Sequence, residues 1–356
     1  MTGNLVPMFE NQSALVPIES NPFNAETPMQ ALTKPITPAH LFYVRNHFDV
    51  PRIDGERWRL TVDGEVRRRL QFSLKELQSL PKRTLGITLE CAGNGRTQMV
   101  PIPKGTPFAH GAVGTARFTG TPLSLLLDQV APRSEAVEVL FVGADEGKVE
   151  SGRVESFARS LPLDVAYKSD ALLALEMNDE ALLPEHGFPV RLVVPRWYGM
   201  ASVKWLTEIS VLRTPFRGYQ QEQYVYLRER GSQVLERVPV TLMKVRAVIG
   251  HPLDDTAVAI RPIEIAGTAW SGFGSIRSVE VSVDNGQSWN LAEIQAAVSP
   301  HAATPWHFTW NAERRGRHTL MARATDSAGN TQPIDPVWNE RGYGNNAVHS
   351  VRITVR

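Results

Sequence analysis

The chain has 356 residues, and its 38 basic residues almost balance its 37 acidic ones. This balance gives no long-range attraction to nucleic acid or to an anionic membrane surface, so we expect neither as a partner. The sequence has no run of 18 apolar residues, and its start lacks the basic and apolar segments of an export signal, which predicts a cytoplasmic protein without a membrane span.

The length predicts more than one domain, because single cores stop growing at roughly 250 to 300 residues. Residues 1–40 are rich in Pro, Asn and Thr without periodicity, and they predict an extended arm laid over the surface. From residue 41 to about residue 230, short β-like runs alternate with short helices, which is typical of a mixed α and β domain. The β-like runs are residues 58–62, 85–89, 136–142 and 190–194.

Two short helices are predicted in this domain. One begins at Ser73, because Ser73 and Glu76 have the spacing of a capping box, in which each side chain accepts from a free backbone N–H of the other residue. The second follows Pro122 and continues through residue 129. Strands do not alternate regularly with helices of roughly 10 to 15 residues, which argues against a doubly wound nucleotide-binding fold.

The composition changes at residues 213–237, which are dense in Gln, Glu, Arg and Tyr, and we place the domain boundary there. From residue 238 to residue 356 the predicted elements are strands. Asn285 and Gly286 predict a tight turn, because both residue types accept positive φ angles. This pattern predicts an immunoglobulin-like sandwich without the cysteine pair of antibody domains. The expected strands are residues 242–249, 263–270, 278–283, 306–310 and 318–324.

Cys91 is the single cysteine, so this chain holds no internal disulfide, haem-attachment motif, zinc ribbon or iron–sulfur cluster of its own. It follows a run in which apolar residues alternate, so we expect it on the apolar face at the C-terminal end of a strand. Gly93 and Gly95 let the backbone turn sharply beside a bulky ligand. The guanidinium of Arg96 offers parallel donors to an oxyanion and is expected to lower the pKa of the thiol.

The residue pattern alone leaves three interpretations of Cys91. A buried core thiol is the simplest, because free cysteine is among the most buried residue types. A phosphate-loop nucleophile is the second, but such phosphatases place five residues between Cys and Arg, whereas four separate Cys91 from Arg96. The third is a thiolate bound to a metal.

The segment TLECAGNGR at residues 88–96 resembles the molybdenum-binding segment of the sulfite oxidase family. Four other segments resemble segments of that family and follow one another in the same order along the chain, so the resemblance spans residues 41–356. It implies an α+β sulfite-oxidase-type molybdopterin-binding domain, followed by an all-β immunoglobulin-like dimerisation domain and therefore a homodimer. These segments are FYVRNH at 42–47, HGFPVR at 186–191, SVKWL at 202–206 and WNERG at 338–342.

The resemblance implies a molybdenum–molybdopterin cofactor with Cys91 as the metal ligand of the protein. A soft thiolate suits a metal that changes oxidation state. Asp145 matches an acidic residue that accepts from the amino groups of the pterin. Taken alone, each matched side chain is more often a solvated charge or a turn residue. The matched cofactor-binding positions are Tyr43, Arg45, His47, Asp145, His186, Arg191, Ser202 and Lys204.

The reaction that the resemblance implies is the oxidation of sulfite to sulfate. Sulfite is a small dianion, so its site is expected to contain guanidinium groups. We predict that Arg45, Arg96 and Arg341 bind it, and the resemblance puts Arg341 at the mouth of the molybdenum pocket although it belongs to the second domain. The chain shows no haem, flavin or cluster signature, so we expect electrons to pass to an external acceptor such as a cytochrome.

Two positions depart from the sulfite-oxidising pattern. Phe157 stands where the family usually has Tyr, so a hydroxyl that contacts substrate is missing, and Phe108 or its neighbour stands where many members have Trp. His110 is a candidate replacement donor, or simply a turn residue. The departures leave two alternatives open: a molybdenum enzyme of the same fold that acts on another oxyanion or an S-oxide, and a non-catalytic interaction protein.

Overall fold

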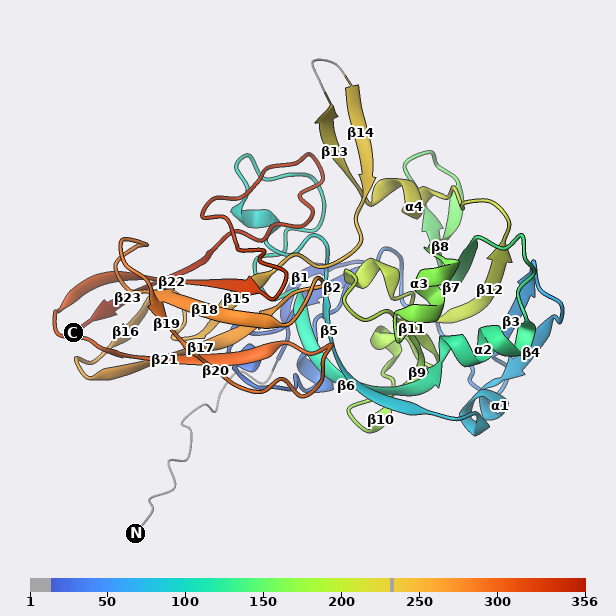
Figure 1. The fold of residues 1–356 in the computed structure, drawn as a ribbon, viewed down its shortest axis with the longest axis horizontal. Coiled ribbons are helices and arrows are strands. Elements are labelled where there is room, and N and C mark those ends of the chain that lie inside the picture. Colours follow the sequence, from blue (N-terminus) through green and yellow to red (C-terminus); the bar gives the residue numbers. More distant parts are fainter. Residues whose placement is uncertain (1–13, 231–233) are drawn as a thin grey trace, which may run out of the picture.

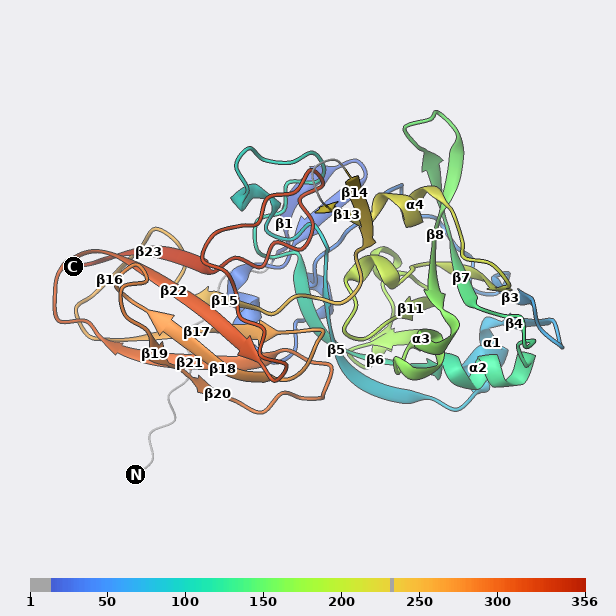
Figure 2. The ribbon, with the colours of Figure 1, turned by 45° about the horizontal axis from the view of Figure 1, so that its top comes forward.

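The computed structural model describes residues 14–230 and 234–356. Two regions lie next to each other along its longest axis, a mixed α and β region and an all-β region that carries the C-terminus (Figure 1, Figure 2). Strands β5 and β6 run where the two regions meet. Residues 1–13 of the predicted arm lie outside the described residues.

The first region contains two five-stranded sheets among the described residues. In one, the order is β10-β9-β6-β5 and β11 also pairs with β9; in the other it is β4-β3-β12-β7-β8. The first sheet comprises β5 (Arg83–Glu90), β6 (Val113–Pro122), β9 (Leu172–Met177), β10 (Glu180–Ala181) and β11 (Arg191–Val193). The second comprises β3 (Arg59–Gly64), β4 (Leu70–Ser73), β7 (Glu138–Lys148), β8 (Val154–Pro162) and β12 (Leu206–Leu212). Both sheets contain strands at the predicted places.

Short helices connect these strands. Ser73 caps α1, and both hydrogen bonds of the predicted capping box with Glu76 are present. Within residues 14–230 and 234–356, no helix combines the length and apolarity that crossing a membrane requires. The α-helices are α1 (Leu74–Ser79), α2 (Leu123–Val130), α3 (Leu163–Lys168) and α4 (Tyr219–Gln223). The 3-10 helices are η1 (Met29–Thr33), η2 (Ala39–Leu41), η3 (Arg96–Gln98), η4 (Pro184–His186) and η5 (Gly199–Ala201).

The second region is a sandwich of a four-stranded and a five-stranded sheet, in the orders β15-β17-β21-β20 and β16-β23-β22-β18-β19. Asn285 and Gly286 have φ angles of 60° and 82° in the turn that leads from β18 to β19, as predicted. Trp306, Val279 and Leu320 are fully buried in the core between the sheets. The strands are β15 (Arg246–His251), β16 (Thr256–Val258), β17 (Pro262–Trp270), β18 (Ile276–Ser282), β19 (Asn290–Leu291), β20 (Glu293–Ile294), β21 (Thr304–Asn311), β22 (Gly316–Asp326) and β23 (His349–Val355).

Two hairpins lie outside these sheets. One projects from the top of Figure 1 and consists of β13 (Val225–Arg230) and β14 (Val234–Pro239). The other consists of β1 (Val16–Ser20) and β2 (Phe23–Glu26) and belongs to the predicted arm. The prediction of an arm laid over the surface is wrong for this stretch, because Glu26 is buried and its carboxylate accepts from the backbone N–H groups of Ala109 and Gly111. Composition does not reveal such pairings.

A buried ion pair joins the two regions at the end of β5. Glu90 Oε1 accepts from Arg246 Nη1 at 3.0 Å, and both side chains are 2% exposed. Asn94 Nδ2 and Trp270 Nε1 also donate to the Glu90 carboxylate, at 3.0 and 2.8 Å. Burial raises the pKa of Glu90, and the positive charge of Arg246 is the largest influence that opposes this shift. The strand that ends beside Cys91 is thereby fixed to the sandwich.

Replacing Arg246 by Met is expected to destabilise the protein by about 3 to 5 kcal/mol, because the Glu90 carboxylate stays buried without its charged partner. Urea unfolding measures the loss. The control is Arg323→Met, which removes the pair with Glu280, where both side chains are more than a quarter exposed. That change should cost less than about 1 kcal/mol. Equal losses in the two variants would contradict the structural importance of the buried pair.

Candidate active site

The loop after β5 places Cys91 as the sequence predicted. Cys91 is 7% exposed and packs with Ile87 and Leu89, the apolar side of the strand. Its N–H donates to Ala112 O at 2.9 Å, so the first residue after the strand is held by the neighbouring chain segment. Gly95 directly precedes the 3-10 helix η3 and has a φ of 84°, a backbone conformation that residues with a side chain rarely adopt.

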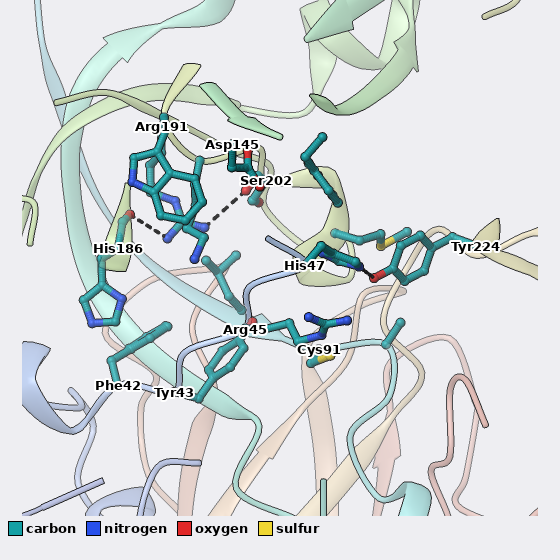
Figure 3. Close-up of a pocket in the computed structure, with 17 residues that line it drawn as sticks. Phe42, Tyr43, Arg45, His47, Cys91, Asp145, His186, Arg191, Ser202 and Tyr224 are labelled. Atoms are coloured by element: carbon teal, nitrogen blue, oxygen red, sulfur yellow. Dashed lines mark hydrogen bonds between the residues drawn. The ribbon is translucent and has the colours of Figure 1, made fainter. Parts of the chain in front are cut away.

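Beside Cys91 opens a cavity, here called the inner cavity, that is lined by every predicted cofactor-binding residue (Figure 3). Tyr43, Arg45 and His47 reach it from the segment after η2. Asp145 reaches it from β7. The remaining four predicted residues come from η4, β11 and the segment after η5, and they are His186, Arg191, Ser202 and Lys204. Segments far apart in the sequence therefore form one polar pocket.

Two buried polar atoms in the inner cavity lack a hydrogen-bond partner among the described residues. Arg191 donates from Nη1 to His186 O at 3.1 Å and from Nη2 to Ser202 O at 3.2 Å, but its Nε has no partner. Asp145 is 4% exposed, and its Oδ1 has none either. Burial raises the pKa of Asp145 to about 6, and Lys204 opposes this shift. Such groups are normally satisfied, so they mark a binding site for a polar ligand.

Two further side chains of the inner cavity are fixed by backbone carbonyls. Lys204 Nζ donates to Glu185 O at 2.8 Å and lies 4.3 Å from the centre of the Trp205 ring. Burial lowers the pKa of His186 to about 3, so its imidazole is neutral, and its Nε2 lies 2.9 Å from Ala39 O, to which it donates. These residues are held in place before any ligand binds.

A second cavity, here called the outer cavity, contains the three predicted substrate arginines, Arg45, Arg96 and Arg341. Arg341 enters it from the second region, as the sequence predicted. The inner and outer cavities share Arg45, Cys91 and Tyr224. Cys91 therefore lies where a pocket with unpaired polar groups meets a pocket rich in positive charge.

Arg96 is positioned by the backbone around it. Its Nε and Nη2 donate to Arg341 O at 3.2 and 3.0 Å, and Nη1 donates to Thr106 O. A guanidinium has five N–H donors, so two remain for an anion. Gly93 and Gly342 pack so closely that a Cβ would lie 2.6 and 2.9 Å from atoms of the Arg96 side chain. These glycines provide the space that the guanidinium needs.

Arg96 lowers the pKa of Cys91 as the sequence predicted, but the net shift is upward. Burial raises the pKa of the Cys91 thiol, and the charges of Arg45 and Arg96 oppose this only in part, with Arg45 the stronger of the two. Desolvation outweighs the arginines because the thiol is buried. A bound metal cation is the kind of charge that deprotonates such a thiol outright.

The sequence did not indicate Tyr224, which lies just after α4 in the stretch interpreted as a domain boundary. It is 4% exposed, its hydroxyl lies 2.8 Å from His47 Nε2, and its ring stacks on Tyr343 with centroids 4.9 Å apart. No motif surrounds it, so only the packing of distant segments reveals it. Arg159 was missed for the same reason; its guanidinium lies 5.4 Å from the centre of the Tyr224 ring.

The two departures from the family pattern lie in different places. Phe157 lines the inner cavity and stacks on His47 at 4.8 Å, so the missing hydroxyl concerns the site. Phe108 is fully buried and packs in the core around Cys91. His110 lines neither cavity among the described residues, and its Nδ1 lies 2.9 Å from Arg246 Nη2. The suggestion that His110 replaces the lost donor is therefore wrong, because the imidazole belongs to the buried cluster around Glu90.

Comparison with known proteins agrees with this arrangement. Residues 47–220 match the model of an oxidoreductase molybdopterin binding domain, and residues 237–356 match that of a Mo-co oxidoreductase dimerisation domain. The chain is 33% identical to the sulfite oxidase of Arabidopsis thaliana, over 93% of this chain and 91% of that protein. The chain belongs to the sulfite oxidase family. The predicted family and fold class are confirmed.

Other members of the sulfite oxidase family differ in length. The mitochondrial sulfite oxidase of Drosophila melanogaster is 33% identical over 97% of this chain, which spans 64% of that relative. Nitrate reductase [NADH] 1 of Arabidopsis thaliana is 32% identical over 97% of this chain and 41% of its own length. The solved structure of the sulfane dehydrogenase SoxCD from Paracoccus pantotrophus aligns with a TM-score of 0.81 at 28% identity, covering 97% of this chain and 86% of that one.

Replacing Gly93 by Ala is expected to displace the Arg96 guanidinium, because the new Cβ would lie 2.6 Å from Nη2. The clash is with the end of a flexible side chain, so the unfolding midpoint should change little. Sulfate affinity, measured by calorimetric titration, should fall by about tenfold through the loss of a charge-assisted contact. Unchanged sulfate affinity would contradict a role for Arg96 in anion binding.

Proposed function

We propose that this member of the sulfite oxidase family is a molybdenum-cofactor oxidoreductase that oxidises sulfite to sulfate. The observation that carries the proposal is the position of Cys91. On one side lies the inner cavity with its unpaired Asp145 and Arg191 atoms, and on the other lies the outer cavity with three arginines. A buried thiol between a polar ligand pocket and an anion pocket suits a metal ligand better than a core residue.

The residues present fit the cofactor. The Cys91 thiolate would hold the metal, and the pterin would occupy the inner cavity. There Asp145 would accept from its amino groups, Arg191 would donate to it, and Lys204 and Arg45 would offer positive charge to its phosphate. When bound, this group supplies the two-electron redox chemistry and the oxygen transfer. The roles of the individual side chains are part of the proposal.

The outer cavity supports the choice of a small dianion as substrate. Sulfite gains one oxygen from water and gives up two electrons as sulfate forms, and the water releases its two protons. Arg45, Arg96 and Arg341 would gather the anion and offset its charge throughout, because donors fixed in advance stabilise charge without reorganisation. Arg96 is held by backbone carbonyls, so its orientation does not depend on substrate.

We further propose that the two electrons leave to an external protein acceptor such as a cytochrome, and that the chain forms a homodimer. The match of residues 237–356 to a dimerisation domain supports the dimer. Exposed apolar side chains close to the outer cavity support a protein acceptor. They lie within four residues of the lining residues Lys104 and Arg341 in the sequence, and Val100, Ile102, Val337 and Trp338 are 89%, 59%, 67% and 48% exposed. Exposed apolar patches of this kind mark interaction sites.

Phe157 supports a second candidate class of substrate. The absence of a hydroxyl on this ring, together with the similarity to a sulfane dehydrogenase structure and to a nitrate reductase, favours a different sulfur compound or oxyanion. Dye-linked assays with sulfite, nitrate and an S-oxide distinguish the two candidates. Turnover of another compound without turnover of sulfite would reject the first.

Replacing Cys91 by Ser is expected to abolish sulfite-dependent dye reduction. The loss should exceed about 100-fold, which is the upper range for removing an outer-shell partner of a metal ligand. Molybdenum content is measured on the same preparations. If Cys91 is instead a core thiol, the variant loses stability but keeps its activity per molybdenum.

Replacing Arg191 by Met is expected to lower cofactor content, because the cavity loses a buried guanidinium whose Nε has no partner among the described residues. Molybdenum by mass spectrometry and pterin by fluorescence after oxidation are the measurements, and affinity should fall by roughly 10- to 100-fold. Arg117→Met is the control, since Arg117 forms an exposed pair with Asp179. Full cofactor content in the Arg191 variant would contradict the assignment.

A further inference from the structure

We propose that a further cavity, at the contact between the two regions, is a binding site for inorganic phosphate. This cavity, here called the interface cavity, shares no lining residue with the inner or the outer cavity. The proposal is therefore independent of the oxidation of sulfite. It depends on the size of the interface cavity, on its charge and on one buried acceptor.

Both regions form the walls of the interface cavity. Thr88 of β5 and Arg196 line it from the first region, and Ser271, Ser299 and His301 line it from the second. The walls are joined, because the Thr88 N–H donates to His301 O at 3.0 Å. The cavity has a volume of about 70 Å³. One water needs roughly 10 to 15 Å³, so there is room for a small polyatomic ion that contacts both regions.

Arg196 gives the interface cavity a positive charge. The lining residues include no Asp or Glu among the part of the chain that the structure describes. The guanidinium of Arg196 is half-buried and forms no ion pair or hydrogen bond within residues 14–230 and 234–356. Its backbone has a φ of 69°, and such strained positions concentrate at binding sites. A guanidinium without a carboxylate partner suits an oxyanion.

His301 adds a buried acceptor to the same cavity. Its Nε2 lies 3.2 Å from Asp170 Oδ2, and Asp170 also pairs with Arg83 at 3.1 Å. A carboxylate only accepts, so the imidazole proton is on Nε2. Burial lowers the pKa of His301, and the hydrogen bond to Asp170 opposes this shift only in part, so the ring is neutral and Nδ1 is an acceptor. Nδ1 is buried and has no partner among the described residues.

An acceptor in the same cavity as a guanidinium distinguishes phosphate from sulfate. At neutral pH phosphate carries at least one O–H, so it can donate to His301 Nδ1 while its other oxygens accept from Arg196. Sulfate has no proton at this pH. It would leave the buried Nδ1 without a donor, which weakens binding. We therefore expect the interface cavity to prefer phosphate over sulfate.

The test is calorimetric titration of purified holoprotein with inorganic phosphate in excess sulfate, which would fill the outer cavity. Arg196→Met should lower phosphate affinity by about tenfold or more, because a charge-assisted contact is lost. Its urea unfolding midpoint without phosphate should stay unchanged, because the guanidinium has no partner to lose. The matched control is Arg277→Met, since Arg277 is exposed and adjoins the lining residue Ile276 without lining the cavity itself.

A second variant isolates the acceptor. In His301→Gln the amide can still donate to Asp170, but it has no acceptor where Nδ1 lies, so phosphate affinity should fall by about fivefold or more. His318→Gln is the control, because His318 does not line the cavity. Wild type that binds no phosphate in excess sulfate, or equal phosphate affinity in the Arg196 and Arg277 variants, overturns the proposal. Phosphate binding that depends on Arg196 supports it even if the protein does not oxidise sulfite.

Discussion

The ion pair between Glu90 and Arg246 is the interaction on which the site depends. Glu90 is the last residue of β5 and directly precedes Cys91, whereas Arg246 begins β15 of the sandwich. Two charges in a buried place are costly unless every lone pair and proton is satisfied. Here Trp270 and Asn94 also donate to the Glu90 carboxylate, and the Arg246 guanidinium also donates to backbone carbonyls, although its Nε has no partner among the described residues. These contacts fix the position of the strand end.

Residues of both regions form the candidate site, next to this ion pair. The backbone carbonyl of Arg341, from the second region, accepts from Arg96 of the first, and Arg341 itself lines the outer cavity. Asn345 Nδ2 donates to Gly95 O at 2.8 Å, which ties the same segment to the loop after Cys91. A small shift between the regions would therefore move the anion pocket relative to Cys91. The sandwich therefore supplies residues to the candidate site.

The polar groups that line the inner and the outer cavity suit two different kinds of ligand. The inner cavity leaves Asp145 and Arg191 with unused hydrogen-bonding capacity, which suits a large polar ligand held by several fixed contacts. The outer cavity is lined by four cationic side chains, Arg45, Arg96, Lys104 and Arg341, and by one carboxylate, Glu150, so it has an excess of positive charge that suits a small anion. Cys91 and Tyr224 line both, so a group bound in one cavity is adjacent to a group bound in the other.

The sequence by itself determined the fold class, the α1 capping box, the strand that presents Cys91 and eight of the residues that line the inner cavity. Local patterns sufficed because alternation, capping and a specific motif such as TLECAGNGR are properties of neighbouring residues. The tertiary structure alone decided the burial of the end of β2, the raised pKa of Cys91, the place of His110 and the presence of Tyr224 in the site. Desolvation and contacts between distant segments arise only when the chain is packed, so no local pattern encodes them.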